Sequence, residues 1–391
     1  MKKITTYLLL IFVLSTMLFA GCSSQPSAGG DAAESDTIKI GWIGSLTGDQ
    51  AVWGTCEFDT LKMVVEDANA AGGLLGKQIE VIGYDTRGDA TEAVNAVKRL
   101  TSQDKVVAIL GPNASGQAIS ISGVLEQMKV ANIATVATNP KVTVNDDGSV
   151  KPYNFRVCFI DPYQGAVAAG YAADKLSFTK AAILYDVTSD YSQGLTEFFE
   201  KTFTEKGGTI VAKEGFKAGD VDFRAQLSKI KEAQPEVIFM PYYYKEVALS
   251  ANQARELGIT SVLMGGDGWP SDQHIEMASE AIEGSFVVNH LDFNDPDVKP
   301  FQEQYKAKYN KNLELNGYLV HDAFKLFEQA VKDANSTDSD AIAKALSTAK
   351  VEGITGKINI SPETHNPEGK EAAIIKITGG NYEFQEKYAA E

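Results

Sequence analysis

Residues 78–110, QIEVIGYDTRGDATEAVNAVKRLTSQDKVVAIL, contain the pattern that decides the fold. Apolar side chains run through 78–84 and again through 106–110, and both runs have the length and composition of buried strands. Residues 90–101 between them have the amphipathic spacing of a helix, and Asp89 is placed to cap its N-terminus. A strand, a helix and a second strand in this order are typical of parallel α/β architecture.

The same alternation extends along the chain. Strands are predicted at 38–43, 78–84, 106–110, 133–137, 155–160, 181–185, 209–215, 236–240 and 261–264. Helices are predicted at 53–71, 90–101 and 116–129, and behind each of the last four of these strands. The pattern then changes to helices at 297–308, 316–334 and 338–349 and short strands at 357–360 and 373–377. Such alternation predicts an α/β protein whose parallel sheets are covered by helices on both faces.

The length of the chain sets the number of domains. About 355 residues follow residue 36, which is enough for two domains of ordinary size. We predict two doubly wound parallel-sheet lobes that join near residues 156–162. Lobe I is assigned residues 37–158 and 289–355, and lobe II residues 159–288 and 356–391. The chain would then pass between the lobes three times, and three strands between two lobes would make a hinge.

The first residues have the features of an export signal. Lys2 and Lys3 precede the apolar stretch 4–19, which is short for a membrane-spanning helix. The next stretch, LFAGC at 18–22, resembles the lipobox of bacterial lipoproteins, with Phe19 where leucine is usual. This resemblance implies a lipoprotein signal peptide at 1–21 and a lipid on Cys22. The polar composition of 22–36 predicts a flexible tether.

The net charge limits the classes of binding partner, and the positions of the cysteines bear on whether a disulfide forms. The formal net charge is −16, and the loss of Lys2 and Lys3 with the signal peptide would change it to −18. An acidic chain argues against nucleic acid and anionic lipid surfaces as partners. No apolar run after the signal is long enough to cross a bilayer. Cys56 opens a predicted helix and Cys158 lies in a predicted strand, which favours two buried thiols, although one disulfide is arithmetically possible.

The sequence contains no recognisable catalytic or metal-binding motif. The histidines are scattered and lack ligand spacing: His274, His290, His321 and His365. GxSxG, P-loop and CxxC motifs are absent, and the glycines of 41–48 are wrongly spaced for a dinucleotide fingerprint. A reaction would need a base beside a nucleophile, and no such pair is evident. We therefore expect no enzyme, no cofactor and no metal site.

Polar residues follow several of the predicted strands. Because ligands bind at the carboxyl ends of parallel strands, we expect these residues to lie near one another. Ser115 lies where a strand gives way to a helix, whose free amides attract anions. Thr138 follows another strand and offers a hydroxyl, and Val136 offers its backbone. One lobe thus supplies donors suited to a carboxylate, although Ser115 taken alone would also serve as a plain helix cap.

Asp267 lies in the glycine-rich stretch MGGDGWP, residues 264–270, after a predicted strand of the other lobe. A turn aspartate that bonds its own backbone is one interpretation. An unpaired carboxylate in a closed cleft costs several kcal/mol, however, so Asp267 is expected to meet a cation there. Donors on one lobe and a carboxylate on the other suit an α-amino acid. Trp53, Tyr191 and Tyr243 would then line the cleft rather than the core, which suggests an apolar or amphipathic ligand side chain.

Several motifs together are similar to those of a known family. They are IKIGWIGSLTGDQAVWG at 38–54, DANAAGGLLGKQIEVIGYD at 67–85, GPNASG at 111–116, ATVATNP at 134–140, FRVCFIDPYQG at 155–165, ILYDVTSDYSQG at 183–194 and MGGDGW at 264–269. On these motifs the chain resembles the solute-binding lipoproteins of the leucine, isoleucine and valine binding family. That family has the periplasmic-binding-protein type I fold and feeds ABC importers. The resemblance extends from residue 38 to the last strands.

The resemblance implies roles for the residues singled out above. Ser115, the backbone of Val136 and Thr138 would hold the carboxylate and amino group of the ligand. Asp267 would meet the ammonium group, where the best-known branched-chain binders have glutamate. Trp53, Tyr191 and Tyr243 are similar to aromatic residues that line the ligand pocket in this family. Tyr318 matches such a position less closely.

The resulting expectation is an extracytoplasmic receptor, held on the bacterial cell membrane through lipid on Cys22. We expect a monomer whose two lobes close by hinge rotation over a free amino acid, branched-chain or otherwise hydrophobic, and deliver it to ABC permease subunits. Two alternatives stay open. One is a binder of the same fold for an amide, urea, an aromatic acid or a γ-amino acid. The other is a sensing domain that reports its ligand to a signalling partner.

Overall fold

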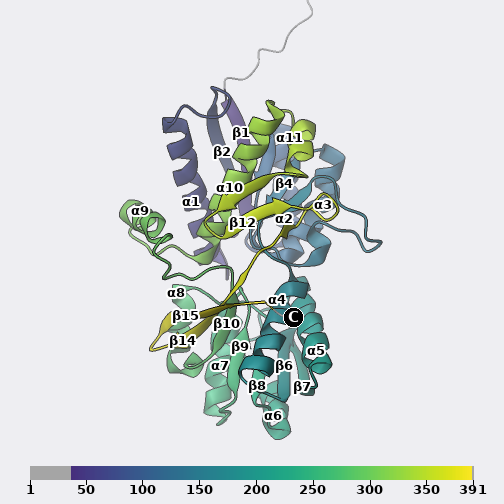
Figure 1. Cartoon of the computed structure of the whole chain (residues 1–391), viewed down its shortest axis with the longest axis vertical. Helices are drawn as coiled ribbons and strands as arrows, with labels where there is room; N and C mark the ends of the chain where they lie inside the picture. Colours follow the sequence, from purple (N-terminus) through teal and green to yellow (C-terminus); the bar gives the residue numbers. More distant parts are fainter. Residues whose placement is uncertain (1–36, 390–391) are drawn as a thin grey trace, which may run out of the picture. The chain divides into compact units, whose positions relative to one another are not determined.

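The computed structural model describes residues 37–389, which contain two large sheets with helices on both faces of each (Figure 1). Within these residues the first sheet has five strands in the order β2-β1-β3-β4-β5, and all neighbours are parallel. Its strands are β1 Thr37–Gly44, β2 Gln78–Asp85, β3 Ala108–Leu110, β4 Ala131–Ala134 and β5 Asn154–Arg156. We define lobe I as this sheet and the segments that pack on it.

Lobe I has an apolar core on each face of its sheet, because successive strand side chains point to opposite faces. Ile40 and Trp42 face the core formed with α1, α10 and α11, whereas Ile43 and Ile109 face the core formed with α2 and α3. The helices are α1 Ala51–Ala70, α2 Ala90–Arg99, α3 Ser115–Met128, α10 Leu315–Ala334 and α11 Ser339–Leu346, with α9 Lys299–Tyr309 beside α1. The predicted cap of α2 is confirmed, since Asp89 Oδ1 accepts from the Glu92 amide at 2.9 Å.

The second sheet has seven strands among the described residues, in the order β15-β14-β10-β9-β8-β6-β7. The strands from β10 to β7 are parallel, and β14 and β15 are antiparallel to their neighbours. They are β6 Lys180–Asp186, β7 Thr209–Phe216, β8 Val237–Phe239, β9 Val262–Gly265, β10 Phe286–Asn289, β14 Ala372–Thr378 and β15 Asn381–Tyr388. We define lobe II as this sheet and its helices, and the predicted α/β class with two doubly wound lobes is confirmed.

The helices of lobe II again cover both faces of the sheet. One face packs against α4 and α5 through Val167, Leu195 and Phe199, and the other packs against α6 and α7 through Leu227 and Val247. The helices are α4 Asp161–Gly170, α5 Asp190–Glu205, α6 Arg224–Ala233, α7 Tyr244–Glu256 and α8 Asp272–Ala278.

The C-terminal part of the chain returns to lobe I before it completes lobe II. The strands β11 Lys350–Gly353, β12 Gly356–Ile360 and β13 Pro367–Glu368 form a small antiparallel sheet. Ile358 and Ile360 are buried in the lobe I core, and the His365 ring stacks on Phe155 of β5 at 4.1 Å. This differs from the sequence-based assignment of 356–391 to lobe II. Pairing of β12 with β11 directs its apolar side chains into lobe I, and only β14 and β15 join the second sheet.

The chain passes between the lobes through three segments of its described part, as predicted. These segments are 157–160, 290–298 and 369–371, and Figure 1 shows them between the two sheets. Phe159 of the first segment and His290 of the second stack with ring centroids 3.6 Å apart. The first segment was expected to continue a strand to residue 160, but β5 ends at Arg156.

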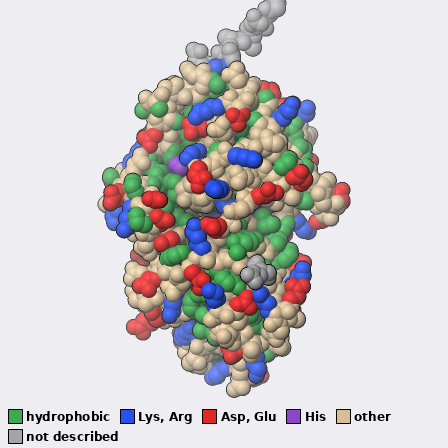
Figure 2. Space-filling view, in the orientation of Figure 1, with side chains coloured by type: hydrophobic (Ala, Val, Ile, Leu, Met, Phe, Trp, Pro, Cys, Tyr) green, Lys and Arg blue, Asp and Glu red, His purple; other side chains and the backbone are tan. Residues whose placement is uncertain are grey.

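Charged side chains of both signs lie on the surface of the described residues, and two cysteines are buried. Figure 2 shows acidic and basic side chains interspersed over one face. No helix within residues 37–389 combines the length and apolar character needed to cross a membrane. Cys56 and Cys158 are free and buried, and burial raises the pKa of each thiol to about 12. The predicted signal peptide, tether and Cys22 lie outside the described residues.

Candidate functional site

The loop after β9 presents Asp267 in a buried position, with 3% of its surface exposed. Its Oδ1 atom accepts a hydrogen bond from the Tyr191 hydroxyl at 2.9 Å, and its Oδ2 atom lies 3.0 Å from Nε2 of His290. The Tyr191 hydroxyl in turn accepts from the amide of Gly268 at 3.0 Å. The loop is anchored by Trp269, whose buried Nε1–H donates to the Met240 carbonyl at 2.9 Å. Asp267 is therefore held in one orientation.

The glycines around Asp267 make room for aromatic rings. A Cβ atom on Gly266 would lie 2.9 Å from the Tyr191 hydroxyl, and one on Gly268 would lie 3.0–3.1 Å from Tyr191 and Tyr243. A Cβ atom on Gly265 would lie 2.1 Å from the Trp269 ring. Neither Gly266 nor Gly268 has a positive φ. Close approach, rather than backbone conformation, is thus the reason for glycine here.

The two side chains that lie within hydrogen-bond distance of Asp267 are both neutral. Burial lowers the pKa of His290, and the neighbouring Asp267 opposes this shift only in part, so the imidazole is neutral at pH 7. Burial also raises the pKa of Tyr191, which keeps its hydroxyl protonated. Within residues 37–389, His290 is the one side chain at ion-pair distance from Asp267. Asp267 is thus a carboxylate with two neutral hydrogen-bond donors and, among residues 37–389, no cationic side chain at ion-pair distance.

Residues from both lobes line one cavity beside Asp267. Its wall contains predicted and unpredicted residues: Gln50, Trp53, Asn113, Ala114, Val136, Tyr191, Tyr243, Asp267, Gly268 and Asn316. The cavity measures about 10 Å³, which is room for about one water molecule. Any larger ligand therefore requires the lobes or their side chains to move apart.

The lobe I side of the cavity is built around the start of α3. Asn113 and Ala114 line the cavity directly before Ser115, the first residue of that helix. Ala118 makes the first intrahelical bond, to Ala114 at 3.0 Å, so the amides of the preceding turn have no acceptor inside the helix. Ser115 itself is buried, and its hydroxyl accepts from the Asn139 amide at 3.2 Å. This end of the helix can therefore receive an anionic group.

The loop that carries Thr138 is held by a buried guanidinium. Arg156 is fully buried and donates to the carbonyls of Ala137 and Asn139 at 2.7 and 2.8 Å. The Thr138 carbonyl accepts from the Asp161 amide at 2.9 Å, which ties the loop to the first residue of α4. The Thr138 hydroxyl is buried and has no hydrogen bond of normal geometry within the described chain. Thr138 does not line the cavity wall, whereas Val136, two residues earlier in the chain, does.

Asp161 is a second buried acid near the cavity that the sequence interpretation missed. Burial raises its pKa well above the ordinary value, the charge of Asp267 adds to this, and the hydroxyl of Thr138 and the charge of Arg156 oppose it. Neither carboxyl oxygen has a hydrogen bond of normal geometry within residues 37–389. A Cβ atom on Gly194 would lie 2.3 Å from Asp161 Oδ2, so a glycine is required there. The sequence signal was an acid directly after the first crossing segment, in FRVCFID.

Aromatic residues from both lobes close the cavity. Tyr191 and Tyr243 stack with centroids 5.2 Å apart and planes 6° apart. Trp53 of lobe I meets Tyr243 and Tyr244 edge to face at 5.8 and 4.8 Å. The Trp53 Nε1–H donates across the lobes to the Pro270 carbonyl at 3.0 Å. All three predicted aromatics thus contact one another or the cavity.

Further contacts between the lobes surround the cavity. The Tyr244 hydroxyl donates to the Asp49 carbonyl at 2.7 Å, and Lys245 pairs with the Asp49 carboxylate. On another side, the Asn139 amide nitrogen donates to the Asp190 carbonyl at 2.8 Å. These contacts join the two lobes in a closed arrangement.

Tyr318, the fourth aromatic candidate, lies outside the cavity. It is fully buried in the lobe I core, and its hydroxyl accepts from Gln302 Nε2 at 2.6 Å. Its ring lies near those of Phe293 and Phe301, so its role is in packing. Asn316, two residues earlier on the same helix, lines the cavity instead and donates to the buried Glu57 at 3.2 Å.

Comparison with known proteins agrees with this architecture. The sequence profile described as periplasmic binding protein matches residues 37–381. A Pseudomonas aeruginosa protein named leucine-, isoleucine-, valine-, threonine-, and alanine-binding protein is 30% identical over 362 residues, with 92% of each chain covered. The crystal structure of a leucine binding protein, LivK from Thermotoga maritima, is 34% identical with a TM-score of 0.83, covering 90% of this chain and 99% of the other.

A second solved structure carries a ligand. It is the branched-chain amino acid transporter substrate binding protein LivJ from Streptococcus pneumoniae in complex with isoleucine, which is 32% identical with a TM-score of 0.82. The alignment covers 90% of this chain and 100% of that one. Profile, sequence relatives and structures agree over nearly all of the described residues. The chain belongs to the periplasmic binding protein family of extracytoplasmic solute-binding proteins.

Proposed function

We propose that the protein binds a free amino acid with an apolar side chain between its lobes and delivers it to an ABC importer. The observation that carries this proposal concerns Asp267, a buried carboxylate that has two neutral hydrogen-bond donors and no cationic partner among residues 37–389. A buried charge of this kind is stabilised by a partner of opposite sign. The ammonium group of an amino acid supplies that partner.

The opposite wall of the cavity supports a ligand with an anionic end. The free amides at the start of α3 lie next to Asn113 and Ala114, which share the cavity with Asp267. We propose that Ser115, the Val136 backbone and Thr138 serve this end. Trp53, Tyr191 and Tyr243 offer an apolar wall to the ligand side chain. The relatives named for leucine, isoleucine and valine agree with such a ligand.

The proposal predicts that both charged ends of the ligand are needed. Isothermal titration of the purified protein with leucine, isoleucine and valine should show binding. The analogue 4-methylpentanoate lacks the amino group, and 3-methylbutylamine lacks the carboxylate. Each should bind at least about 100-fold more weakly than leucine, because a buried charge loses its partner.

Binding of an aromatic acid, which has a carboxylate but no amino group, tests the alternative ligand class. Benzoate that binds as tightly as leucine, or 4-methylpentanoate that does so, would contradict the role of Asp267 and favour a binder of carboxylic acids. A thermal-shift screen over amino acids and small amides extends the comparison, because a ligand raises the unfolding temperature by mass action.

We propose further that the protein acts as a monomer without catalytic activity, held on the cell membrane through lipid on Cys22. The family is extracytoplasmic, and the lipobox-like sequence LFAGC ends at that residue. In a bacterial host, the wild-type chain should be recovered with membranes and the variant Cys22→Ser should be released from them. Equal release of both proteins would contradict the anchor.

A further inference from the structure

His290 connects the cavity to the segments that join the lobes. It is the first residue after β10, on the second crossing segment, and 5% of its surface is exposed. Its Nε2 atom lies 3.0 Å from Asp267 Oδ2, and its ring stacks on Phe159 of the first crossing segment with planes 17° apart. One side chain thus contacts both of these crossing segments and the carboxylate of the cavity.

The hydrogen-bonding state of His290 follows from its surroundings. Burial, together with the charge of Lys370, lowers its pKa, while Asp267 and Asp322 oppose this. A neutral imidazole next to a carboxylate carries its proton on the nitrogen that faces the carboxylate. The other nitrogen, Nδ1, is buried without a partner among the described residues, as expected for a nitrogen that carries no proton. His290 therefore donates to Asp267 without adding a positive charge.

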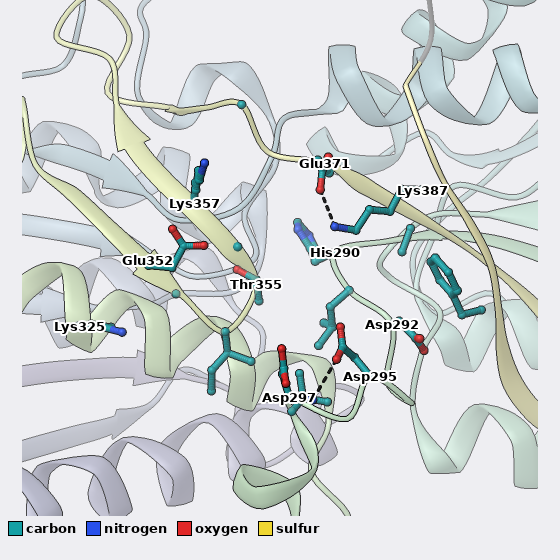
Figure 3. A pocket seen from close by; sticks show the side chains of 18 residues that line it. His290, Asp292, Asp295, Asp297, Lys325, Glu352, Thr355, Lys357, Glu371 and Lys387 are labelled. Atoms are coloured by element: carbon teal, nitrogen blue, oxygen red, sulfur yellow. Dashed lines mark hydrogen bonds and ion pairs between the residues drawn. The ribbon is translucent and has the colours of Figure 1, made fainter.

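The crossing segments also border open space. A cavity of about 870 Å³ lies beside them, and its wall contains His290, Leu291 and Asp292 of the second segment and Gly369 and Glu371 of the third. Figure 3 shows His290 among the side chains that line it, near the ion pair of Glu371 and Lys387. Because this volume is not filled by side chains of the described residues, a small rotation of the segments meets little packing resistance on this side.

We infer that His290 is a positioning residue that aims the Asp267 carboxylate at the cationic group of the ligand and couples this contact to the arrangement of the crossing segments. The inference rests on the proposed function, since it needs a ligand that carries an ammonium group. Its physical basis is that the Nε2–H bond fixes one carboxylate oxygen while the Phe159 stack fixes the imidazole.

Two variants of His290 separate the hydrogen bond from the ring. His290→Phe keeps an aromatic ring on Phe159 and removes the donor, whereas His290→Gln keeps an N–H donor and removes the ring. Titration with leucine should show affinity at least about tenfold lower in His290→Phe than in the wild type, because a hydrogen bond to a charged group is lost. His290→Gln should recover most of that loss.

A second background tests whether the effect passes through Asp267. In Asp267→Asn, the further change His290→Phe should alter leucine affinity by less than about twofold, because the carboxylate is already gone. His274→Phe is the matched control. His274 is buried, contacts the Tyr382 hydroxyl at 3.0 Å and does not line the cavity. Phenylalanine keeps the edge-to-face ring contact with Trp269, so this variant should lower thermal stability and leave leucine affinity unchanged.

The outcomes distinguish the two proposals. Absence of leucine binding by the wild type would overturn the proposed function and the role of His290 with it. Wild-type binding with an unchanged affinity in His290→Phe would overturn the positioning role alone. The same would follow if His290→Phe lowered affinity equally in the Asp267→Asn background, since the effect would then be structural.

Discussion

Substitution of Asp267 by asparagine removes one negative charge and little else. The side chain keeps its size, and its carbonyl oxygen can still accept from the Tyr191 hydroxyl. The new amide faces His290, which is neutral and can move its proton to Nδ1 and accept with Nε2. This shift buries an Nδ1–H without a partner, and the loss of an uncompensated buried charge offsets that cost. The free protein should therefore keep its fold, and its unfolding temperature should change little.

The size of the effect on binding follows from the burial of Asp267. An ammonium group about 4 Å from a carboxylate gains about 4 kcal/mol at an effective dielectric constant of about 20. Desolvation of the ligand offsets part of this gain, so a net loss of about 2–4 kcal/mol is expected. This loss corresponds to a dissociation constant for leucine that is roughly 30- to 1000-fold higher. Only 3% of Asp267 is exposed, so added salt should change the difference little.

Isothermal titration at pH 7 and two salt concentrations measures this difference directly. Asp186→Asn is a suitable control, because Asp186 is also a buried acid at the end of a lobe II strand but lies outside the cavity wall. A dissociation constant within threefold of the wild type would refute the assignment of Asp267 to the ligand's cationic group. Equal losses in Asp267→Asn and Asp186→Asn would refute it as well.

Three further changes probe the closed arrangement and its surroundings. Trp53→Phe removes the hydrogen bond to the opposite lobe and leaves a buried carbonyl unpaired, so titration should show leucine binding that is roughly 5- to 150-fold weaker. Gly268→Ala places a methyl group 3.0 Å from the Tyr191 hydroxyl, so calorimetry should show weaker leucine binding, and unchanged affinity would refute the close fit. Burial, aided by Asp272, raises the pKa of Glu314 from 4.5 to about 8. The stabilising contribution of Glu314 is then complete below pH 4.5 and is lost as the pH rises to about 8. In urea unfolding it should add a decline of at most about 1.4 kcal/mol per pH unit to that of the other buried acids, and Glu314→Gln should remove this part alone.

Much of the fold was predictable because alternating apolar runs and amphipathic helices depend on local sequence. The strands that were not predicted lack this signal. β15 lies at the edge of its sheet with the sequence NYEFQEKY, whose side chains are mostly exposed or half-buried. β12 was predicted as a strand, but its place in lobe I depends on pairing with β11, which is a tertiary choice.

The candidate site was only partly predictable. The rule that ligands bind at strand ends led to Asp267 and Val136, and the structure places both on one cavity wall. His290 gave no signal, because its contact with Asp267 depends on how the second crossing segment leaves β10. Tyr318 is an aromatic residue like several of those that line the cavity. Only the rotation of α10 about its axis places the Tyr318 side chain in the core.

The order of segments along the chain has a consequence for biosynthesis. Ile38 and Ile360 belong to the same apolar core, so lobe I lacks part of its interior until the ribosome has translated beyond residue 360. The second sheet likewise waits for β14 and β15, which are made last. Neither lobe can finish folding on a nascent chain, because loops that span most of the sequence must close first. The chain therefore stays incompletely folded until translation is nearly finished. An incompletely folded chain can still pass through an export channel, which suits a polypeptide that acts outside the cytoplasm.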